Sequence, residues 1–384
     1  MQKNRTAIFA ASKRVVIKVG SNVLTRDNGL NLEVIRSISA QISRIMDTGR
    51  SIILVSSGAM AAGIRKLDLP GRPDETPSRQ AVAAVGQAGL IREYEKAFAA
   101  FGRKVAQLLL TAEDMNSRKR YLNARNALNT LLSWKVVPII NENDTVMVEE
   151  IQFGDNDNLA AVISLLMDAD LLINLTDIDG LFTKDPRSFP DAELIPTVDT
   201  IGKGLERLAS DIPGALGTGG MLSKIRAARK VTEAGIPMVI TRGLQENVLE
   251  RLFAGDALGT YFQPKPRRLS SRKCWIGFTM KPKGMIRIDE GAARAILLQG
   301  KSLLPSGITS VEGDFGVGDP VAFQNQREEV LGSGLVNYSS GEIRRIMGKR
   351  TSQIAQCLGR KPFDEVVHRD NLVITRDATT EACR

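Results

Sequence analysis

Short polar side chains follow an apolar segment in the middle of the chain, and they are the residues best suited to chemistry. The segment Val136–Ile140 leads into Asn141-Glu-Asn-Asp144, and Gly154-Asp-Asn-Asp-Asn158 precedes an apolar helical pattern. Three aspartates and four asparagines thus fall within eighteen positions: Asp144, Asp155, Asp157, Asn141, Asn143, Asn156 and Asn158. Beside the carboxyl end of a strand, where open α/β sheets bind ligands, this set could hold a small zwitterion, orient a metal or fix cationic side chains. Helix capping and turns are the alternative, because Asn and Asp favour both.

Two further segments could bind an anion. Lys18 lies in the otherwise apolar strand pattern Arg14–Gly20. An ammonium there needs an anionic partner or an exit to water, so it indicates either a phosphate site or a strand-end lysine that reaches solvent. Ser56–Gly63 opens a helix with small residues, and the free N–H groups of a helix start attract anions. Tight packing of this helix against the sheet is the alternative interpretation.

Two later loops also resemble phosphate-binding segments. Thr176–Pro186 leaves an apolar strand as a polar loop, which indicates either a nucleotide contact or a surface turn. Gly217–Lys224 is rich in glycine and runs into a helix, but it lacks the Gly-Lys-Ser/Thr of a Walker A motif. Its backbone amides, helix N-terminus and lysine still suit a triphosphate. A flexible loop between domains is the alternative.

Composition excludes several kinds of catalytic site. The chain has 384 residues, with one histidine and three widely separated cysteines, Cys274, Cys357 and Cys383. This set fits neither a disulfide framework nor a Cys/His zinc site, and a Ser-His-Asp triad is disfavoured as well. Lysines, glycine-rich helix starts and an Asp/Asn cluster without a nucleophile favour phosphoryl transfer, which depends on positioning and charge neutralisation.

The formal charge of +9 is concentrated in two segments. Residues 1–14 and 262–275 contain basic residues and no acidic ones. The second segment indicates a solvated spacer, with nucleic-acid contact as the alternative. No apolar stretch approaches the ~20 residues of a membrane helix, and the N-terminal apolar segment is too short for a secretory signal. We therefore expect a cytoplasmic protein with no membrane partner.

Apolar strands alternate with helical patterns up to about residue 260, which predicts a mainly parallel sheet buried on both faces. The predicted strands are 14–20, 51–56, 104–110, 136–140, 170–176 and 237–241. The predicted helices are 31–48, 58–67, 78–101, 119–133, 159–167 and 221–234. From about residue 280, short segments punctuated by glycine predict a small β-rich domain.

The order and spacing of these motifs resemble the amino acid kinase family. The motifs are Ile17-Lys-Val-Gly-Ser21, Val55-Ser-Ser-Gly-Ala59, Asn141-Glu-Asn-Asp144, Gly154-Asp-Asn-Asp-Asn158 and Gly217-Thr-Gly-Gly-Met221. The Asn-Glu-Asn-Asp and Gly-Asp-Asn-Asp-Asn motifs resemble the branch that phosphorylates the γ-carboxylate of free glutamate in proline biosynthesis. The C-terminal segments Asp289-Glu-Gly-Ala292, Lys301–Ile308 and Gly318-Asp319 resemble a PUA domain.

The resemblance implies a sandwich of helices around a mainly parallel sheet, with ATP and glutamate across the strand ends. It implies that Lys18 and Lys224 neutralise the transferring phosphoryl group and that Asp157 holds both lysines. The glutamate-binding residues that it implies are Ser57, Gly58, Asn141, Asp144 and Asn156. The nucleotide-binding residues that it implies are Lys18, Thr176, Asp177, Thr218, Gly219, Gly220, Met221 and Lys224. ATP would bind as its Mg²⁺ complex, with no metal site made by the protein.

The resemblance also divides the chain and implies partners. We expect an N-terminal tail at 1–13, a kinase domain at 14–261, a linker at 262–279, a PUA-like domain at 280–376 and a C-terminal tail at 377–384. Proline is the expected feedback inhibitor, and a homo-oligomer is expected. RNA binding through the PUA-like domain is the rival function, although residues 276–384 hold 15 basic and 13 acidic side chains. A kinase for another acidic substrate is the second alternative.

Overall fold

The computed structural model describes residues 2–26, 29–146, 155–210, 220–266 and 268–374. The chain divides into two compact units, Met1–Arg268 and Leu269–Arg384. The boundary between them falls inside the segment 262–279, which the sequence predicts to be a linker. In the described parts of the chain, no helix is both long and apolar enough to cross a membrane.

The first unit is built on an eight-stranded sheet with the order β5-β6-β4-β1-β7-β9-β10-β8. The strands from β5 to β9 in this order are parallel, β10 runs antiparallel to β9, and β8 pairs parallel to β10. Their bounds are β1 Arg14–Val19, β4 Ser51–Ser56, β5 Val105–Leu110, β6 Val137–Glu142, β7 Leu171–Thr176, β8 Thr197–Val198, β9 Met238–Arg242 and β10 Thr260–Phe262. The predicted mainly parallel sheet is therefore confirmed.

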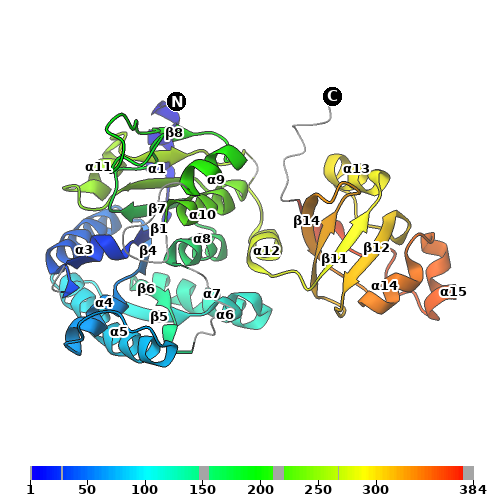
Figure 1. Cartoon of the computed structure of the whole chain (residues 1–384), viewed down its shortest axis with the longest axis horizontal. Helices are drawn as coiled ribbons and strands as arrows, with labels where there is room; N and C mark the ends of the chain where they lie inside the picture. Colours follow the sequence, from blue (N-terminus) through cyan, green and yellow to red (C-terminus); the bar gives the residue numbers. More distant parts are fainter. Residues whose placement is uncertain (1, 27–28, 147–154, 211–219, 267, 375–384) are drawn as a thin grey trace. The chain divides into compact units, whose positions relative to one another are not determined.

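Helices cover both faces of this sheet, with α3 on one side of β1 and β4 and with α8 and α10 on the other (Figure 1). The helices are α1 Gln2–Ala11, α2 Ser21–Leu24, α3 Leu32–Asp47, α4 Ala59–Lys66, α5 Thr76–Ala99, α6 Ala112–Asn116, α7 Arg118–Ser133, α8 Asn156–Leu166, α9 Lys203–Ser210, α10 Met221–Glu233 and α11 Val248–Ala254. A 3₁₀ turn, η1 Asp144–Val146, follows β6, and β2 Thr25–Arg26 pairs antiparallel with β3 Gly29–Leu30. The layers are those of an αβα sandwich.

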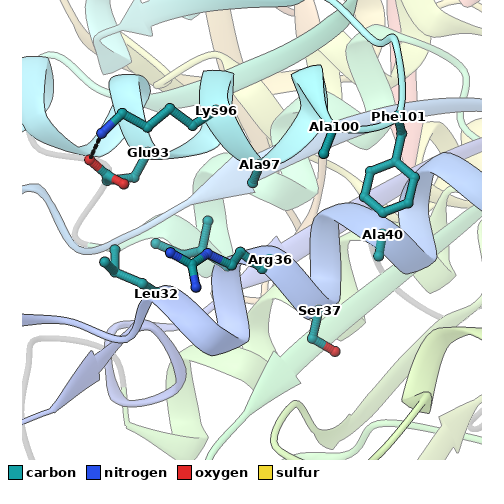
Figure 2. Close-up of a pocket in the computed structure, with 10 residues that line it drawn as sticks. Leu32, Arg36, Ser37, Ala40, Glu93, Lys96, Ala97, Ala100 and Phe101 are labelled. Atoms are coloured by element: carbon teal, nitrogen blue, oxygen red, sulfur yellow. Dashed lines mark hydrogen bonds and ion pairs between the residues drawn. The ribbon is translucent and has the colours of Figure 1, made fainter.

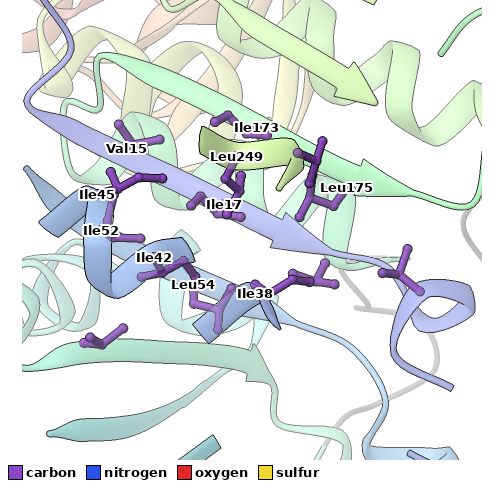
Figure 3. Packing of buried hydrophobic residues seen from close by; sticks show 14 of the residues in the cluster. Val15, Ile17, Ile38, Ile42, Ile45, Ile52, Leu54, Ile173, Leu175 and Leu249 are labelled. Atoms are coloured by element: carbon purple, nitrogen blue, oxygen red, sulfur yellow. The ribbon is translucent and has the colours of Figure 1, made fainter. Parts of the chain in front are cut away.

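The core explains why these segments fold as they do. Every second residue of β1, from Val15 to Val19, faces the same side of the sheet and packs against α3, which presents Ile38, Ile42 and Ile45 at helical spacing (Figure 3). The intervening residues of β1 face the opposite layer, toward α8. The sheet is therefore buried on both faces, and a polar side chain pointing into either layer needs a partner.

The N-terminal segment, which the sequence predicts to be a tail, contains helix α1. Phe9 is buried and packs edge-to-face on Phe253 of α11, with ring centroids 5.5 Å apart. The guanidinium of Arg5 donates to the carbonyl of Leu258 and lies 5.6 Å from the ring centroid of Tyr261. The basic residues at this end of the chain therefore serve in part to dock a helix.

The second unit contains a five-stranded sheet with the order β12-β11-β13-β14-β15, in which only β11 and β13 pair in parallel. The strands are β11 Gly284–Ile288, β12 Ile308–Gly313, β13 Pro320–Gln324, β14 Val330–Leu335 and β15 Leu372–Ile374. The helices are α12 Ser271–Cys274, α13 Glu290–Gln299, α14 Ser340–Ile346 and α15 Ile354–Leu358, with a π-helical turn at Trp275–Thr279. These elements enclose a separate apolar core, as predicted for a small β-rich domain.

Candidate active site

The register of the central strands brings two polar side chains into one layer. Lys18 of β1 pairs with Asn174 of β7, so both side chains leave the sheet on the face covered by α8. Asp157, in the first turn of α8, receives both of them. Its Oδ1 lies 2.5 Å from Lys18 Nζ and accepts a hydrogen bond of 2.8 Å from Asn174 Nδ2. Lys18 is therefore paired inside the protein and does not reach solvent through its strand end.

Helix α10 completes this cluster from the neighbouring position. Lys224 Nζ donates to Asp157 Oδ2 at 3.1 Å, and Ser223 Oγ donates to the same oxygen at 2.9 Å. Lys18, Lys224 and Asp157 are each 6% exposed or less. The structure thus brings together the three residues predicted to act in catalysis, with one carboxylate between two ammonium groups.

Electrostatics keep the carboxylate of this cluster charged. Burial alone would raise the pKa of Asp157, but Lys18 and Lys224 hold that pKa well below its usual value. Burial lowers the pKa of Lys18, and the charge of Asp157 opposes this effect. A single carboxylate therefore faces two ammonium groups, and the positive charge in excess can meet an incoming phosphate.

A second group of predicted residues meets beside this cluster. Asn156 Nδ2 donates to Ser57 Oγ at 2.9 Å and to Asn141 Oδ1 at 3.0 Å. Among the described residues, Asn156 Oδ1 is buried and has no hydrogen-bond partner. Gly58 follows Ser57 with φ +102° at the start of α4, a left-handed conformation that disfavours any residue with a side chain. The group therefore offers an unused acceptor next to a backbone turn.

Asp144 lies at the start of η1, which packs against α5. Burial raises the pKa of Asp144, and the Arg72 guanidinium partly offsets this effect. Within the described residues, no interaction places Asp144 in the Ser57–Asn141–Asn156 group. A partly buried carboxylate with a raised pKa gains from a cationic ligand, which would restore the stability of its charged form.

The predicted nucleotide-binding residues lie at the ends of β7 and at the start of α10. Thr176 Oγ1 donates to Asp177 Oδ1 at 2.9 Å, and Asn22 Nδ2 donates to Asp177 Oδ2 at 2.9 Å. Burial opposes these bonds, but together they lower the pKa of Asp177. Gly220 is the N-cap of α10 and Met221 is its first, buried residue. Thr218 and Gly219 lie outside the described residues.

The N-terminus of α10 has the features of an anion site. Among the described residues, no side chain caps this helix at Gly220, and the N–H groups of a first helical turn beside Lys224 suit an anion. The described residues contain no group of three or more His, Cys, Asp or Glu side chains that could hold a metal ion. These groups suit a nucleotide whose Mg²⁺ is bound chiefly by phosphate and water.

Capping accounts for only part of the Asp/Asn cluster. Asp155 is the N-cap of α8, and its Oδ1 accepts from the backbone N–H of Asn158 at 2.8 Å. Asn156 and Asp157, in contrast, direct their side chains to residues of other elements. Because α8 begins at Asn156 and not at Leu159, the cluster forms the first turn of the helix itself. Capping and site formation are therefore combined there.

Sequence reasoning missed four polar residues that support the site: Asn174, Ser223, Asn22 and Lys230. For Asn174 the signal was available, because it is the only amide in the apolar strand β7 and lies in register with Lys18. For Ser223 the signal was its position, because it immediately precedes Lys224 in the glycine-rich segment Gly217–Lys224. The partners of Asn22 and Lys230 are Asp177 and Asn158, which lie far away in sequence. No local pattern identifies such pairs.

A pocket of about 450 Å³ lies elsewhere in the first unit, between α3 and α5 (Figure 2). Leu32, Ala97 and Phe101 contribute apolar surface to it, and the Glu93–Lys96 ion pair lies at its edge. None of the predicted site residues lines this pocket.

The comparisons with known proteins agree with this arrangement. The family model described as "Amino acid kinase family" matches residues 13–242, which is more than half of the chain. A glutamate 5-kinase of Syntrophus aciditrophicus is 50% identical over 376 residues, covering 98% of each chain. This chain belongs to the amino acid kinase family, in the branch of the glutamate 5-kinases. A glutamate 5-kinase of Geobacter sulfurreducens is 49% identical over 96% of this chain and 100% of the relative.

The second unit has its own family match. The PUA domain model matches residues 284–358, which lie entirely within the unit Leu269–Arg384. Among solved structures, a carbamate kinase from Giardia lamblia matches 67% of this chain and 100% of its own, at 18% identity and a TM-score of 0.49. Family membership therefore rests on the family models and on the sequence relatives.

Proposed function

We propose that this chain transfers the γ-phosphoryl group of ATP to the γ-carboxylate of L-glutamate, giving L-glutamyl 5-phosphate and ADP in the first step of proline biosynthesis. The observation that carries the proposal is the buried Lys18–Asp157–Lys224 cluster at the carboxyl ends of parallel strands. The glutamate 5-kinases that resemble the chain over nearly its whole length support the same substrate.

The two ammonium groups serve the transferring phosphoryl group. A γ-carboxylate oxygen of glutamate attacks the γ-phosphorus of ATP, and the bond to the ADP oxygen breaks. Negative charge lies on the phosphoryl oxygens throughout, so Lys18 and Lys224 stabilise it from fixed positions. Asp157 holds both lysines before substrate arrives, which removes the cost of ordering them during the reaction.

The amide and carboxylate groups serve the amino acid. Asp144 would receive the α-ammonium group, because a cation offsets the burial that raises the pKa of this carboxyl. The unused Oδ1 of Asn156 would accept a further hydrogen bond from the substrate. Ser57, Gly58 and Asn141 would complete this pocket. A free α-amine is therefore part of what is recognised.

The nucleotide would lie along the strand ends from Thr176 and Asp177 to the start of α10. Gly220, Met221 and the backbone N–H groups of α10 would contact its phosphates, together with Thr218 and Gly219 of the preceding loop. Mg²⁺, bound mainly through phosphate oxygens and water, would supply charge neutralisation when the nucleotide is bound.

The partners of the chain extend this proposal. Proline resembles a cyclised glutamate and would compete at the pocket around Asp144. We further propose a cytoplasmic homo-oligomer in which residues 14–261 form the kinase domain and 280–376 the PUA-like domain. RNA binding is the less favoured function, because the C-terminal region is nearly balanced in charge. Submicromolar RNA binding with a steep salt dependence would support RNA binding as a function of the chain.

A substrate panel tests the proposal. ADP formation by the purified full chain should depend on L-glutamate and should be much slower with N-acetylglutamate, aspartate or uridylate. N-Acetylglutamate is the most informative comparison, because it keeps both carboxylates and loses only the cationic amine. Equal rates with glutamate and N-acetylglutamate would contradict the role of Asp144, and turnover with uridylate alone would contradict the whole assignment.

A further inference from the structure

A third lysine approaches the catalytic cluster from helix α10. Lys230 lies six residues after Lys224, and α10 packs closely against α8. Its Nζ donates to Asn158 Oδ1 at 2.6 Å, so it reaches the first turn of α8 without bonding to Asp157. Part of the Lys230 side chain is exposed, but its ammonium group ends among polar groups of the α8 N-terminus.

Asn158 connects this lysine to a second carboxylate. The backbone N–H of Asn158 donates to Asp155 Oδ1 at 2.8 Å, and Asp155 acts electrostatically on Lys230. Asp155 also interacts with Lys18 and with Asp157. Burial raises the pKa of Asp155, and the nearby charge of Asp157 raises it further. A nearby cation would stabilise the charged form of this carboxylate.

The charges around the cluster are therefore linked through Asp155. Asp157 is held between Lys18 and Lys224, while Asp155 acts electrostatically on Lys230 and is itself affected by Lys18. Asp155 draws on the field of Lys18, which is needed for the phosphoryl group, and Lys230 provides a further cation that Asp155 acts on.

Among the described residues packed on α10 from other elements, no further cation has a hydrogen bond to the first turn of α8. On α9, Glu206 is bound to Arg229 of α10, and the same arginine binds Glu233. The segment after β10 approaches through the backbone N–H of Lys265, which donates to the carbonyl of Thr232. Arg226 is exposed on α10. Lys230, in contrast, donates a hydrogen bond to Asn158 of α8, close to Asp155.

We propose that Lys230 is a positioning residue for phosphoryl transfer, which holds Asn158 and balances Asp155 so that Lys18 and Lys224 keep their charge for the substrate. The inference rests on the proposed glutamate kinase activity. Lys230 would act through the N-terminus of α8 and not by contact with either substrate.

Lys230 should make the activity depend on pH. Burial lowers the pKa of Lys230 to about 8, and Asp155 only partly opposes this. The ammonium is present at pH 7 and is lost as the pH rises through about 8. Activity should therefore decline in this range, earlier than the titration of an ordinary lysine would cause.

Three variants of the full chain test this, with kcat for glutamate measured from pH 6.5 to 9.5 at saturating ATP and Mg²⁺. Lys230→Met should lower kcat at pH 7 by about tenfold, the scale of one hydrogen bond to a charged group, while the KM for ATP changes less than about twofold. Lys230→Arg, which stays protonated, should keep kcat within about threefold and move the alkaline decline up by about one pH unit or more. Arg226→Met removes an exposed charge from the same helix and should match the wild-type profile.

Failure of the role of Lys230 can be distinguished from failure of the proposed kinase activity. Wild-type kcat at pH 7 in Lys230→Met, or an unchanged alkaline decline in Lys230→Arg, would overturn the inference. If the methionine variant unfolds, the arginine variant still decides through its pH profile. Absence of glutamate-dependent turnover in the wild type would instead contradict the proposed function.

Discussion

The two units of this chain differ in whether they bury charged side chains. Among the described residues of Met1–Arg268, the buried charged side chains are Arg5, Lys18, Glu142, Asp157, Asp185 and Lys224. Among those of Leu269–Arg384, the buried polar side chains are Ser333 and Ser340, and no charged residue is buried. The second unit is held by an apolar core that includes Ile286, Phe323 and Tyr338.

Within the first unit, the buried charges of Lys18, Asp157 and Lys224 serve the proposed chemistry, whereas that of Arg5 docks helix α1. Burying a charge costs free energy unless it is paired, and a well-packed apolar group would often stabilise the fold as well or better. The first unit nevertheless keeps two lysines and an aspartate in its interior, at the strand ends where ligands bind. The second unit carries its charges on its surface, so any recognition by it occurs there.

The largest expected effect comes from breaking the buried cluster. Asp157→Asn keeps the shape of the side chain but leaves two ammonium groups facing a neutral amide. We expect stability to fall by about 3–5 kcal/mol, because unpaired buried charges remain. Urea unfolding measures this, with Asp364→Asn as the matched control. Asp364 pairs with Lys361 on the surface of the second unit, so its substitution should leave the midpoint unchanged. Equal effects of the two substitutions would remove the contrast between the units.

Asp144→Ala should act on substrate binding. Loss of an ionic hydrogen bond to the α-ammonium group predicts a rise in the KM for glutamate of about ten- to a hundredfold, with a smaller change in the KM for ATP. Inhibition by proline should weaken in parallel. Proline inhibition that persists unchanged in this variant would indicate a separate effector site.

Removing the second unit should have a smaller effect on the reaction. Arg268 donates to the carbonyls of Asp168 and Ala169, both at 2.7 Å, so the truncated chain should end after this residue. We expect it to fold and to phosphorylate glutamate within about tenfold of the full chain, a change of at most ~1.4 kcal/mol in the barrier. A truncated chain that is folded by circular dichroism but inactive would place the second unit within the catalytic apparatus.

The smallest effect is expected for a surface ion pair of the second unit. Lys283 Nζ lies 2.8 Å from Asp319 Oδ1, and the lysine side chain is 58% exposed. Lys283→Ala should cost at most about 1 kcal/mol of stability and leave kcat unchanged, because solvent screens such pairs. A large loss of activity in this variant would show that surface charges of the second unit act on the kinase site.

The same contrast explains what could be predicted from the sequence. Apolar strands and helical spacing identify the sheet and most of its helices, because burial sets those patterns locally. Helix α11 was not predicted, since its packing on α3 and α1 comes from distant parts of the chain. The family resemblance implies the proposed roles of Lys18 and Asp157, but their 2.5 Å contact depends on the register of β1 with β7 and on the start of α8 at Asn156. The interaction of Lys230 with Asn158 spans 72 positions, and no local spacing indicates it.

The most direct test of the central claim is single-turnover transfer from γ-labelled ATP to glutamate by the wild type and by Lys224→Ala. The ammonium of Lys224 lies 3.1 Å from Asp157 Oδ2 and is proposed to stabilise the phosphoryl group. The wild type should form a labelled acyl phosphate that reacts with hydroxylamine, and the variant should form it on the order of 10²-fold more slowly or worse, with ATP binding retained. Transfer at the wild-type rate in Lys224→Ala would contradict the claim that the buried charges of the first unit carry out the reaction.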